Sequence, residues 1–187
     1  MSPHVMAILG PAWGLSELLF ALKTRSKSNA ASKDRGSLAL IWIVCLISIL
    51  LGVFVAEKGI GWKFPARRIF YETGLVVFVA GVVFRWYSII YLGRFFTPNV
   101  AIVDKHQLIE AGPYRFIRHP TYAGMLLVFL GMGLNIGNLA SLLIIMAPIV
   151  AALWWRMRIE EAVMITAFGD QYRAYMQRTK RLVPLIY

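Results

Sequence analysis

The stretch GPYRFIRHPTYAG (residues 112–124) is the one long polar and aromatic segment in a chain made mostly of apolar runs, and it directly precedes one of them. Pro120 favours a helix start at that position, because a proline in the first turn gives up no backbone hydrogen bond. A helix that begins there directs its unpaired amides and its positive dipole end toward any group that lies beside Arg118 and His119. The stretch therefore predicts an anion site, with the basic flank of a membrane helix as the alternative.

The composition excludes an ordinary soluble domain, because apolar residues make up 59% of the 187 residues. Two of the apolar runs cover ~28 and ~36 Å as helices, enough to cross a hydrocarbon core of about 30 Å. The fourth apolar run, residues 121–135, covers only ~22 Å, so we expect that it does not cross the membrane alone. Asn-Ile-Gly-Asn at residues 135–138 predicts the tip of a hairpin that joins it to the fifth. The five runs are residues 5–22, 38–56, 69–92, 121–135 and 139–155.

These runs predict an all-α polytopic membrane protein with about five transmembrane helices, the last two forming a helical hairpin. We expect a single domain over residues 1–187, with the membrane-spanning helices in residues 1–92. The polar chemistry lies in residues 93–187, which we expect to form the cofactor-binding catalytic half.

The net charge of +11 raises the question of nucleic acid, but the position of the basic residues argues against it. Of the 20 Lys and Arg residues, fifteen lie in residues 23–35, 94–118 and 156–181, and four lie in residues 57–68. The positive-inside rule then places the first three segments on the cytoplasmic side. We expect contacts with membrane lipids, no nucleic acid, and a prokaryotic cell membrane with the active site facing the cytoplasm.

Arg85 is a basic residue within the third apolar run. A charge inside a membrane helix indicates function. Because Arg85 lies near the end of its run, we expect its side chain to extend to the lipid headgroups instead.

A second polar cluster, Trp-Trp-Arg-Met-Arg-Ile-Glu-Glu at residues 154–161, follows the fifth run. Arg156 and Glu160 are four residues apart and share a helix face. Carboxylates where a helix leaves the membrane cost desolvation, which favours a functional role over an ordinary ion pair. The hairpin brings this cluster beside residues 112–124. Such a site suits S-adenosylmethionine, whose carboxylate fits a helix N-terminus and whose cationic groups fit Glu160 and tyrosine faces.

Three motifs in this half resemble the isoprenylcysteine carboxyl methyltransferase family and its prokaryotic relatives. They are Tyr-Arg-Phe-Ile-Arg-His-Pro-Thr-Tyr-Ala-Gly from Tyr114, Arg-x-x-x-Glu-Glu from Arg156, and Phe-Gly-x-x-Tyr-x-x-Tyr from Phe168. The Arg-His-Pro-x-Tyr-x-Gly part also occurs in membrane phospholipid methyltransferases and sterol reductases. The resemblance implies transmembrane helices with S-adenosylmethionine enclosed under the C-terminal segment.

The resemblance also implies roles for individual residues. Glu160 would bind the cofactor and Arg156 would face the methyl acceptor. Apart from the resemblance, an amine acceptor would require a base, for which Glu161 or a histidine is the candidate. No metal site is expected, because no His-Glu-x-x-His pattern is present. The other cofactor-binding candidates are Asn99, His106, Gln107, Leu108, Ile109, Tyr114, His119, Pro120, Thr121 and Tyr122.

The favoured function is methyl transfer from S-adenosylmethionine to a lipophilic acceptor that enters from the bilayer, in particular carboxyl O-methylation of an isoprenylcysteine-like substrate. Phosphatidylethanolamine N-methylation is the alternative, because Arg156 can bind a phosphate as well as a carboxylate. An NAD(P)H-dependent sterol-type reductase would use Arg115 and Arg118, although Glu160 and Glu161 disfavour a polyphosphate. A non-enzymatic membrane scaffold leaves the polar cluster unexplained, and the oligomeric state has no clear sequence signal.

Overall fold

The computed structural model describes residues 5–24, 36–98 and 107–183. In these parts the chain is helical, and its extended backbone pairs only as two isolated bridges, which confirms the all-α prediction. The elements are α1 (Val5–Thr24), α2 (Ser37–Glu57), α3 (Arg67–Leu92), η2 (Gly93–Phe95), η3 (Gly112–Arg115), α4 (Pro120–Ile136), α5 (Leu139–Phe168) and α6 (Asp170–Arg178).

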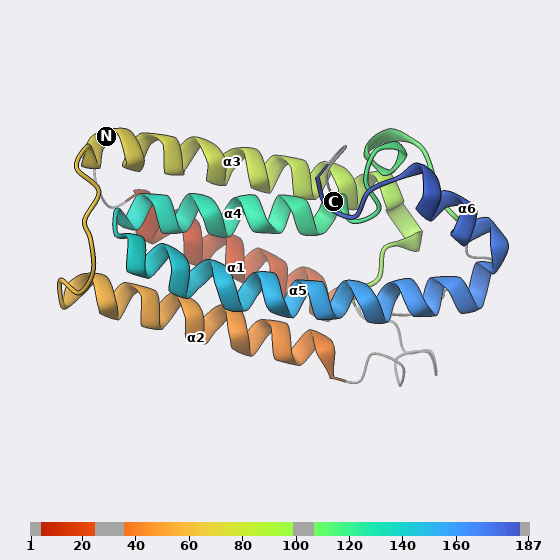
Figure 1. Cartoon of the computed structure of the whole chain (residues 1–187), viewed down its shortest axis with the longest axis horizontal. Coiled ribbons are helices and arrows are strands. Elements are labelled where there is room, and N and C mark those ends of the chain that lie inside the picture. Colours follow the sequence, from red (N-terminus) through yellow and green to blue (C-terminus); the bar gives the residue numbers. More distant parts are fainter. Residues whose placement is uncertain (1–4, 25–35, 99–106, 184–187) are drawn as a thin grey trace.

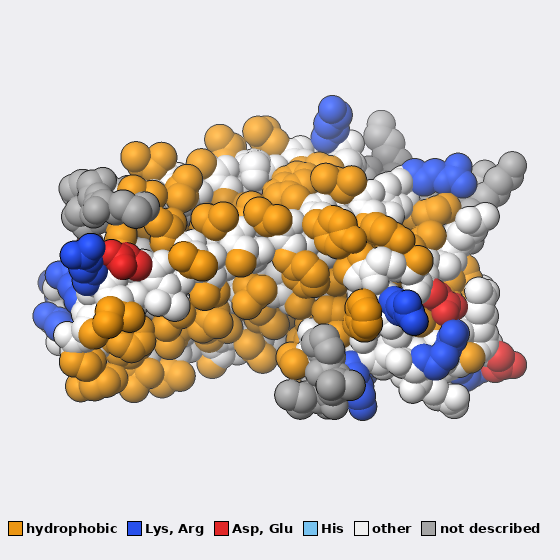
Figure 2. Space-filling view, turned by 90° about the horizontal axis from the view of Figure 1, so that it is seen from above, with side chains coloured by type: hydrophobic (Ala, Val, Ile, Leu, Met, Phe, Trp, Pro, Cys, Tyr) orange, Lys and Arg blue, Asp and Glu red, His pale blue; other side chains and the backbone are white. Residues whose placement is uncertain are grey.

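The helices α1 to α5 run side by side along the long axis of the molecule (Figure 1). Four of them, α1, α2, α3 and α5, are long and apolar enough to cross a membrane, whereas α4 is a shorter apolar helix of 17 residues. The surface along the middle of the bundle is mostly hydrophobic, and charged side chains gather toward its two ends (Figure 2). The protein is therefore an integral membrane protein, with a short fourth helix as the sequence predicts.

The short helix α4 is held against α3 at backbone distance. A Cβ on Gly81 of α3 would lie 2.6 Å from the amide nitrogen of Val128, and one on Gly131 of α4 would lie 2.5 Å from the amide nitrogen of Phe78. Only glycine permits this approach, which is typical of helix pairs within membranes. The seam fixes the position of α4, and with it the polar turn at its N-terminus.

The turn between α4 and α5 confirms the predicted hairpin. Gly137 has a left-handed backbone (φ 74°), and the Asn138 side chain accepts a hydrogen bond from the Ser141 amide at 3.1 Å, which caps α5. The Asn138 amide also donates to the Ile60 carbonyl at 2.9 Å, so the turn is tied to the loop after α2. The helix α5 contains Pro148 and continues past the predicted end at residue 155 as far as Phe168. The second polar cluster, residues 154–161, therefore lies within this helix.

The ends of α1, α3 and α5 and the beginnings of α2 and α4 meet at the same end of the bundle, which also carries α6 (Figure 1). We call this the polar end. It brings together residues 112–124 and residues 154–161, as the hairpin predicts.

Candidate active site

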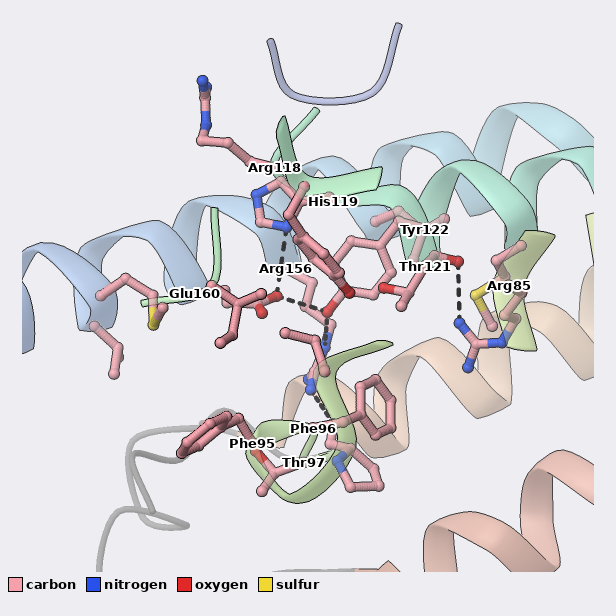
Figure 3. A pocket seen from close by; sticks show the side chains of 18 of the residues that line it. Arg85, Phe95, Phe96, Thr97, Arg118, His119, Thr121, Tyr122, Arg156 and Glu160 are labelled. Atoms are coloured by element: carbon pink, nitrogen blue, oxygen red, sulfur yellow. Dashed lines mark hydrogen bonds and ion pairs between the residues drawn. The ribbon is translucent and has the colours of Figure 1, made fainter. Parts of the chain in front are cut away.

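A cavity at the polar end collects most of the residues predicted to bind the cofactor. Arg85, Thr121, Tyr122, Arg156 and Glu160 all border it and reach it from different helices (Figure 3). Asn99 and His106 lie outside the described residues. Pro120 is buried, and neither it nor Glu161 is among the described residues that line the cavity. The predicted residues that do line it are Gln107, Leu108, Ile109, Tyr114, His119, Thr121, Tyr122, Arg156 and Glu160.

Tyr122 joins the two residues that the sequence places on one face of α5. Its hydroxyl donates to Glu160 Oε2 at 2.8 Å and accepts from Arg156 Nε at 3.0 Å. The other guanidinium nitrogens of Arg156 donate to the Ser37 hydroxyl and to the Pro98 carbonyl. Arg156 is therefore a fixed cation that ties α5 to α2, α4 and the segment after α3.

Glu161 has entirely different surroundings from its neighbour. Its carboxylate accepts from Arg118 Nε at 2.9 Å and from Arg181 Nη2 at 2.7 Å, and His119 Nε2 lies 3.3 Å away. The side chain of Glu161 is 4% exposed, against 35% for Glu160. Glu161 therefore holds a buried cationic cluster together, while Glu160 faces the cavity.

The amides at the start of α4 are largely taken up within the protein. The amide groups of Arg118 and His119 donate to the carbonyls of Lys180 and Arg181 at 2.8 and 3.0 Å, and those of Tyr122 and Ala123 donate to the His119 carbonyl. The α4 start at Pro120 is confirmed. These four amides are engaged by protein carbonyls, however, so the predicted anion site gains no support from them.

His119 lies between the two glutamates. Its Nδ1 is 3.7 Å from Glu160 Oε2, and its ring stacks on Tyr122 with centroids 5.5 Å apart. The imidazole is therefore close to both carboxylates, one on each ring nitrogen.

Three buried tyrosines, Tyr114, Tyr172 and Tyr175, close the cavity on the side of η3 and α6. The hydroxyl of Tyr175 donates to the Tyr114 carbonyl at 2.6 Å. Burial raises the pKa of all three phenols, and the Glu160 carboxylate raises the pKa of Tyr114 and Tyr172 further. The phenols therefore stay neutral near pH 7 and offer aromatic faces and hydroxyls, with no phenolate base.

Sequence reasoning missed the part of the cavity that comes from residues 1–92, where α1, α2 and α3 contribute Phe20, Trp42 and Arg85. The prediction for Arg85 was wrong. Its side chain is 9% exposed and is paired with Glu17 of α1 at 2.6 Å, because a buried partner is available across the bundle. The signal was present: Glu17 is the only charged residue in the first apolar run, and such a charge calls for a partner of opposite sign.

Among the described residues, no group of three His, Cys, Asp or Glu side chains lies close enough together to hold a metal ion. The polar groups that line the cavity are instead two carboxylates, three guanidinium groups, an imidazole and neutral phenols, and the rest of the lining is mainly apolar. This set suits an organic cation and a lipophilic molecule.

Comparison with known proteins gives consistent results. A sequence profile of the phospholipid methyltransferase family matches residues 69–171, more than half of the chain. A protein-S-isoprenylcysteine O-methyltransferase of Schizosaccharomyces pombe is 27% identical over 158 residues, which cover 78% of this chain and 67% of that protein. A probable protein-S-isoprenylcysteine O-methyltransferase of Oryza sativa subsp. indica is 32% identical over 115 residues and 60% of each chain.

The fold has a solved counterpart. The structure of a eukaryotic intramembrane Ras methyltransferase, isoprenylcysteine carboxyl methyltransferase, superposes with a TM-score of 0.61 at 27% identity. The match covers 78% of this chain and 52% of that one, so the present chain spans about half the length of the solved protein.

Proposed function

We propose that this chain, which belongs to the phospholipid methyltransferase family, transfers a methyl group from S-adenosylmethionine to the carboxylate of an isoprenylcysteine-like lipid. Its similarity to isoprenylcysteine carboxyl methyltransferases supports this choice of acceptor. The observation that carries the proposal is the connected set Glu160, Tyr122 and Arg156 on the wall of a cavity that is also lined by apolar side chains from α1 and α2. It pairs an acidic group for a cationic donor with a basic group for an anionic acceptor.

The residues present fit the proposed donor. Glu160 offers a partly exposed carboxylate for a sulfonium or ammonium charge, and the neutral rings of Tyr114 and Tyr172 line the same cavity. Gln107, Leu108 and Ile109 would contact the rest of the molecule. When bound, S-adenosylmethionine supplies a methyl group on a sulfonium sulfur, which becomes a neutral thioether once an acceptor oxygen takes that methyl.

Arg156 would orient the acceptor. Its guanidinium is held by contacts from three elements and is 3% exposed, so its geometry is set before the acceptor binds. A fixed guanidinium favours a carboxylate oxygen in one orientation, and alignment with the methyl group is the main demand of this reaction. Ile41 and Trp42 of α2 would exclude water and receive the lipid chain.

A carboxylate acceptor needs no base, and this agrees with the position of Glu161. We assign Glu161 a positioning role in place of the catalytic role expected from the sequence, because its carboxylate is engaged by Arg118 and Arg181. An amine acceptor such as phosphatidylethanolamine would have to lose a proton to His119 or Glu160. The family profile keeps that reaction as the second candidate.

We also propose an orientation for the protein. The described basic residues in segments 94–98, 107–118 and 156–181 lie toward the polar end, and the positive-inside rule favours the cytoplasm for this end. An acceptor dissolved in the bilayer would then enter from the side, between helices. We keep the prokaryotic cell membrane as the expected location.

The proposal is tested by methyl transfer with purified protein in lipid nanodiscs. Radiolabelled S-adenosylmethionine is supplied with an S-farnesylcysteine or with phosphatidylethanolamine, and binding of S-adenosylmethionine and NADPH is measured separately. We expect a labelled product from the farnesylated acid that releases methanol in mild base, as a methyl ester does.

Three results would overturn the proposal in different ways. A base-stable labelled lipid would favour N-methylation. NADPH binding without S-adenosylmethionine binding would point to a reductase. Binding of neither ligand, with Arg156→Ala as stable and as inert as the wild type, would leave a non-enzymatic role.

A further inference from the structure

A second charged contact lies deeper in the bundle than the Glu160 site. Arg85 of α3 and Glu17 of α1 form a bidentate pair, with Nε to Oε1 and Nη2 to Oε2 both at 2.6 Å. Each residue lies seven positions before the end of its helix, at Leu92 and Thr24, or ~10 Å inside the span at 1.5 Å per residue. The side chains are only 9% and 5% exposed, so both charges are held within the protein.

This pair is the polar attachment of α1 to the bundle. The other side-chain hydrogen bonds described for α1, from Ser16 and Thr24, return to carbonyls of α1 itself. Apolar contacts also attach α1, among them Trp13, whose ring meets Phe78 and Phe129 edge to face at 6.3 and 5.6 Å. The half of α1 nearest the polar end is therefore held to α3 by the ion pair of Glu17 and by Phe20, whose ring meets Trp86 edge to face at 5.1 Å.

Arg85 also reaches the turn that carries the site. Its Nη1 donates to the Thr121 carbonyl at 3.1 Å, in the first turn of α4 (Figure 3). The next residue is Tyr122, which joins Glu160 to Arg156. A Cβ on Gly124 would lie 2.8 Å from the backbone nitrogen of Arg85, so the two helices touch here. Arg85 thus connects the wall made by α1 to the residue that holds the proposed catalytic groups.

The cavity changes character at this pair. Glu17 and Arg85 line the same cavity as Glu160, but their neighbours in it on α1 and α2 are mainly apolar. These neighbours, which we call the apolar arm, are Phe20, Ala21, Leu38, Ile41 and Trp42. An acceptor with its carboxylate near Arg156 would place its hydrocarbon chain in this arm.

We propose that Glu17 and Arg85 are positioning residues that hold α1 as a wall of the apolar arm and fix the first turn of α4, and so match the length of the acceptor's lipid chain to the position of its carboxylate. This inference rests on the proposed function and adds to it the residues that select the acceptor. Without the pair, α1 would keep only apolar contacts such as those of Trp13 and Phe20, and its position beside the cavity would be less fixed, while the donor contacts at Glu160 remain.

The test compares Glu17→Gln and Arg85→Lys with the wild type in nanodiscs. Steady-state rates are measured for S-farnesylcysteine and for the shorter S-geranylcysteine, together with the Kd for S-adenosylmethionine. We expect the KM for S-farnesylcysteine to rise by roughly tenfold, and the preference between the two acceptors to shrink, with the donor Kd within about twofold of the wild type. Arg68→Gln is the matched control, because its pair with Glu72 on the same helix is exposed at the surface.

A purely structural role predicts a different pattern. It would lower kcat by the same factor for both acceptors, or it would weaken donor binding as much as acceptor binding. Either result would overturn the inference. If the single variants do not fold, the double variant Glu17→Leu, Arg85→Met replaces the buried pair by apolar side chains of similar size, which often preserves stability. A double variant with wild-type acceptor preference would also overturn it. Wild-type protein that methylates neither acceptor would overturn the proposed function and the inference together, whereas an active wild type with unaffected variants would overturn the inference alone.

Discussion

Two neighbouring carboxylates at the end of α5 lie in different regions of the molecule. Glu160 points into the cavity and contacts the Tyr122 hydroxyl, with 35% of its side chain exposed. Glu161 points the other way, into its group of cationic partners Arg118 and Arg181, which we call the closing cluster, and 4% of its side chain is exposed. Consecutive residues on a helix are turned by about 100°, so one step along the chain separates the two regions.

The adjacent pair Glu160 and Glu161 therefore serves two physical purposes. The carboxylate of Glu161 compensates the charges of the buried Arg118 and the part-buried Arg181, and it ties residues 179–181 to α5 and the start of α4. The carboxylate of Glu160 is left available for a ligand charge. Substitutions at the two positions are therefore expected to fail in different assays.

The largest effect is expected for Glu161→Gln. Removing one partner of a buried ion cluster leaves uncompensated charge, so the free energy of unfolding should fall by about 3–5 kcal/mol. Thermal unfolding in detergent measures this loss. Glu72→Gln, in an exposed pair with Arg68, should cost no more than about 1 kcal/mol. Equal stability of both variants would contradict the assignment of Glu161 to the closing cluster.

Glu160→Gln should show the opposite pattern. We expect S-adenosylmethionine to bind about 10- to 150-fold more weakly, as the loss of a contact to a charged group of about 1.5–3 kcal/mol implies. The unfolding temperature should stay near that of the wild type. Isothermal titration calorimetry tests the affinity, with Asp170→Asn at an exposed acidic position as the control. Unchanged donor affinity would remove Glu160 from the donor site.

His119 lies between the two regions, so His119→Asn sharpens the comparison. It should lower the unfolding free energy by about 0.5–1.5 kcal/mol, the usual value of the one hydrogen bond to Glu161, and weaken donor binding by less, because the contact to Glu160 at 3.7 Å is longer than a hydrogen bond. The two quantities come from the same unfolding and titration experiments. A change confined to one of them would show that the imidazole serves that region alone.

The smallest effect is expected for Tyr122→Phe, which keeps the ring and removes the hydroxyl between Glu160 and Arg156. Two hydrogen bonds are lost, and a net cost of about 0.5–1.5 kcal/mol predicts a decrease in kcat/KM of roughly 2- to 13-fold. Initial rates with S-farnesylcysteine measure it. Tyr87→Phe, at a half-exposed position on α3, should leave the rate unchanged. If the two variants behave alike, the hydroxyl does not organise the site.

Much of the fold is legible in the sequence because hydropathy and turn chemistry act on single segments. Each apolar run became one helix, Pro120 begins α4, and Asn138 caps α5 after the predicted hairpin. The motifs around Tyr122 and Glu160 likewise identified the part of the cavity that lies beside the hairpin, since the hairpin that joins them is itself encoded locally.

The pairing of charged side chains was decided by the tertiary structure and not by any local sequence pattern. The sequence shows Arg85 as a lone charge in an apolar run, and only the bundle brings Glu17 to it from a helix 68 positions away. The sequence also shows Glu160 and Glu161 as equal neighbours, and only the packing of residues 179–181 against the start of α4 engages one and leaves the other facing the cavity. The physical reason is that burial cost depends on the three-dimensional surroundings of a charge, which no single segment of a chain contains.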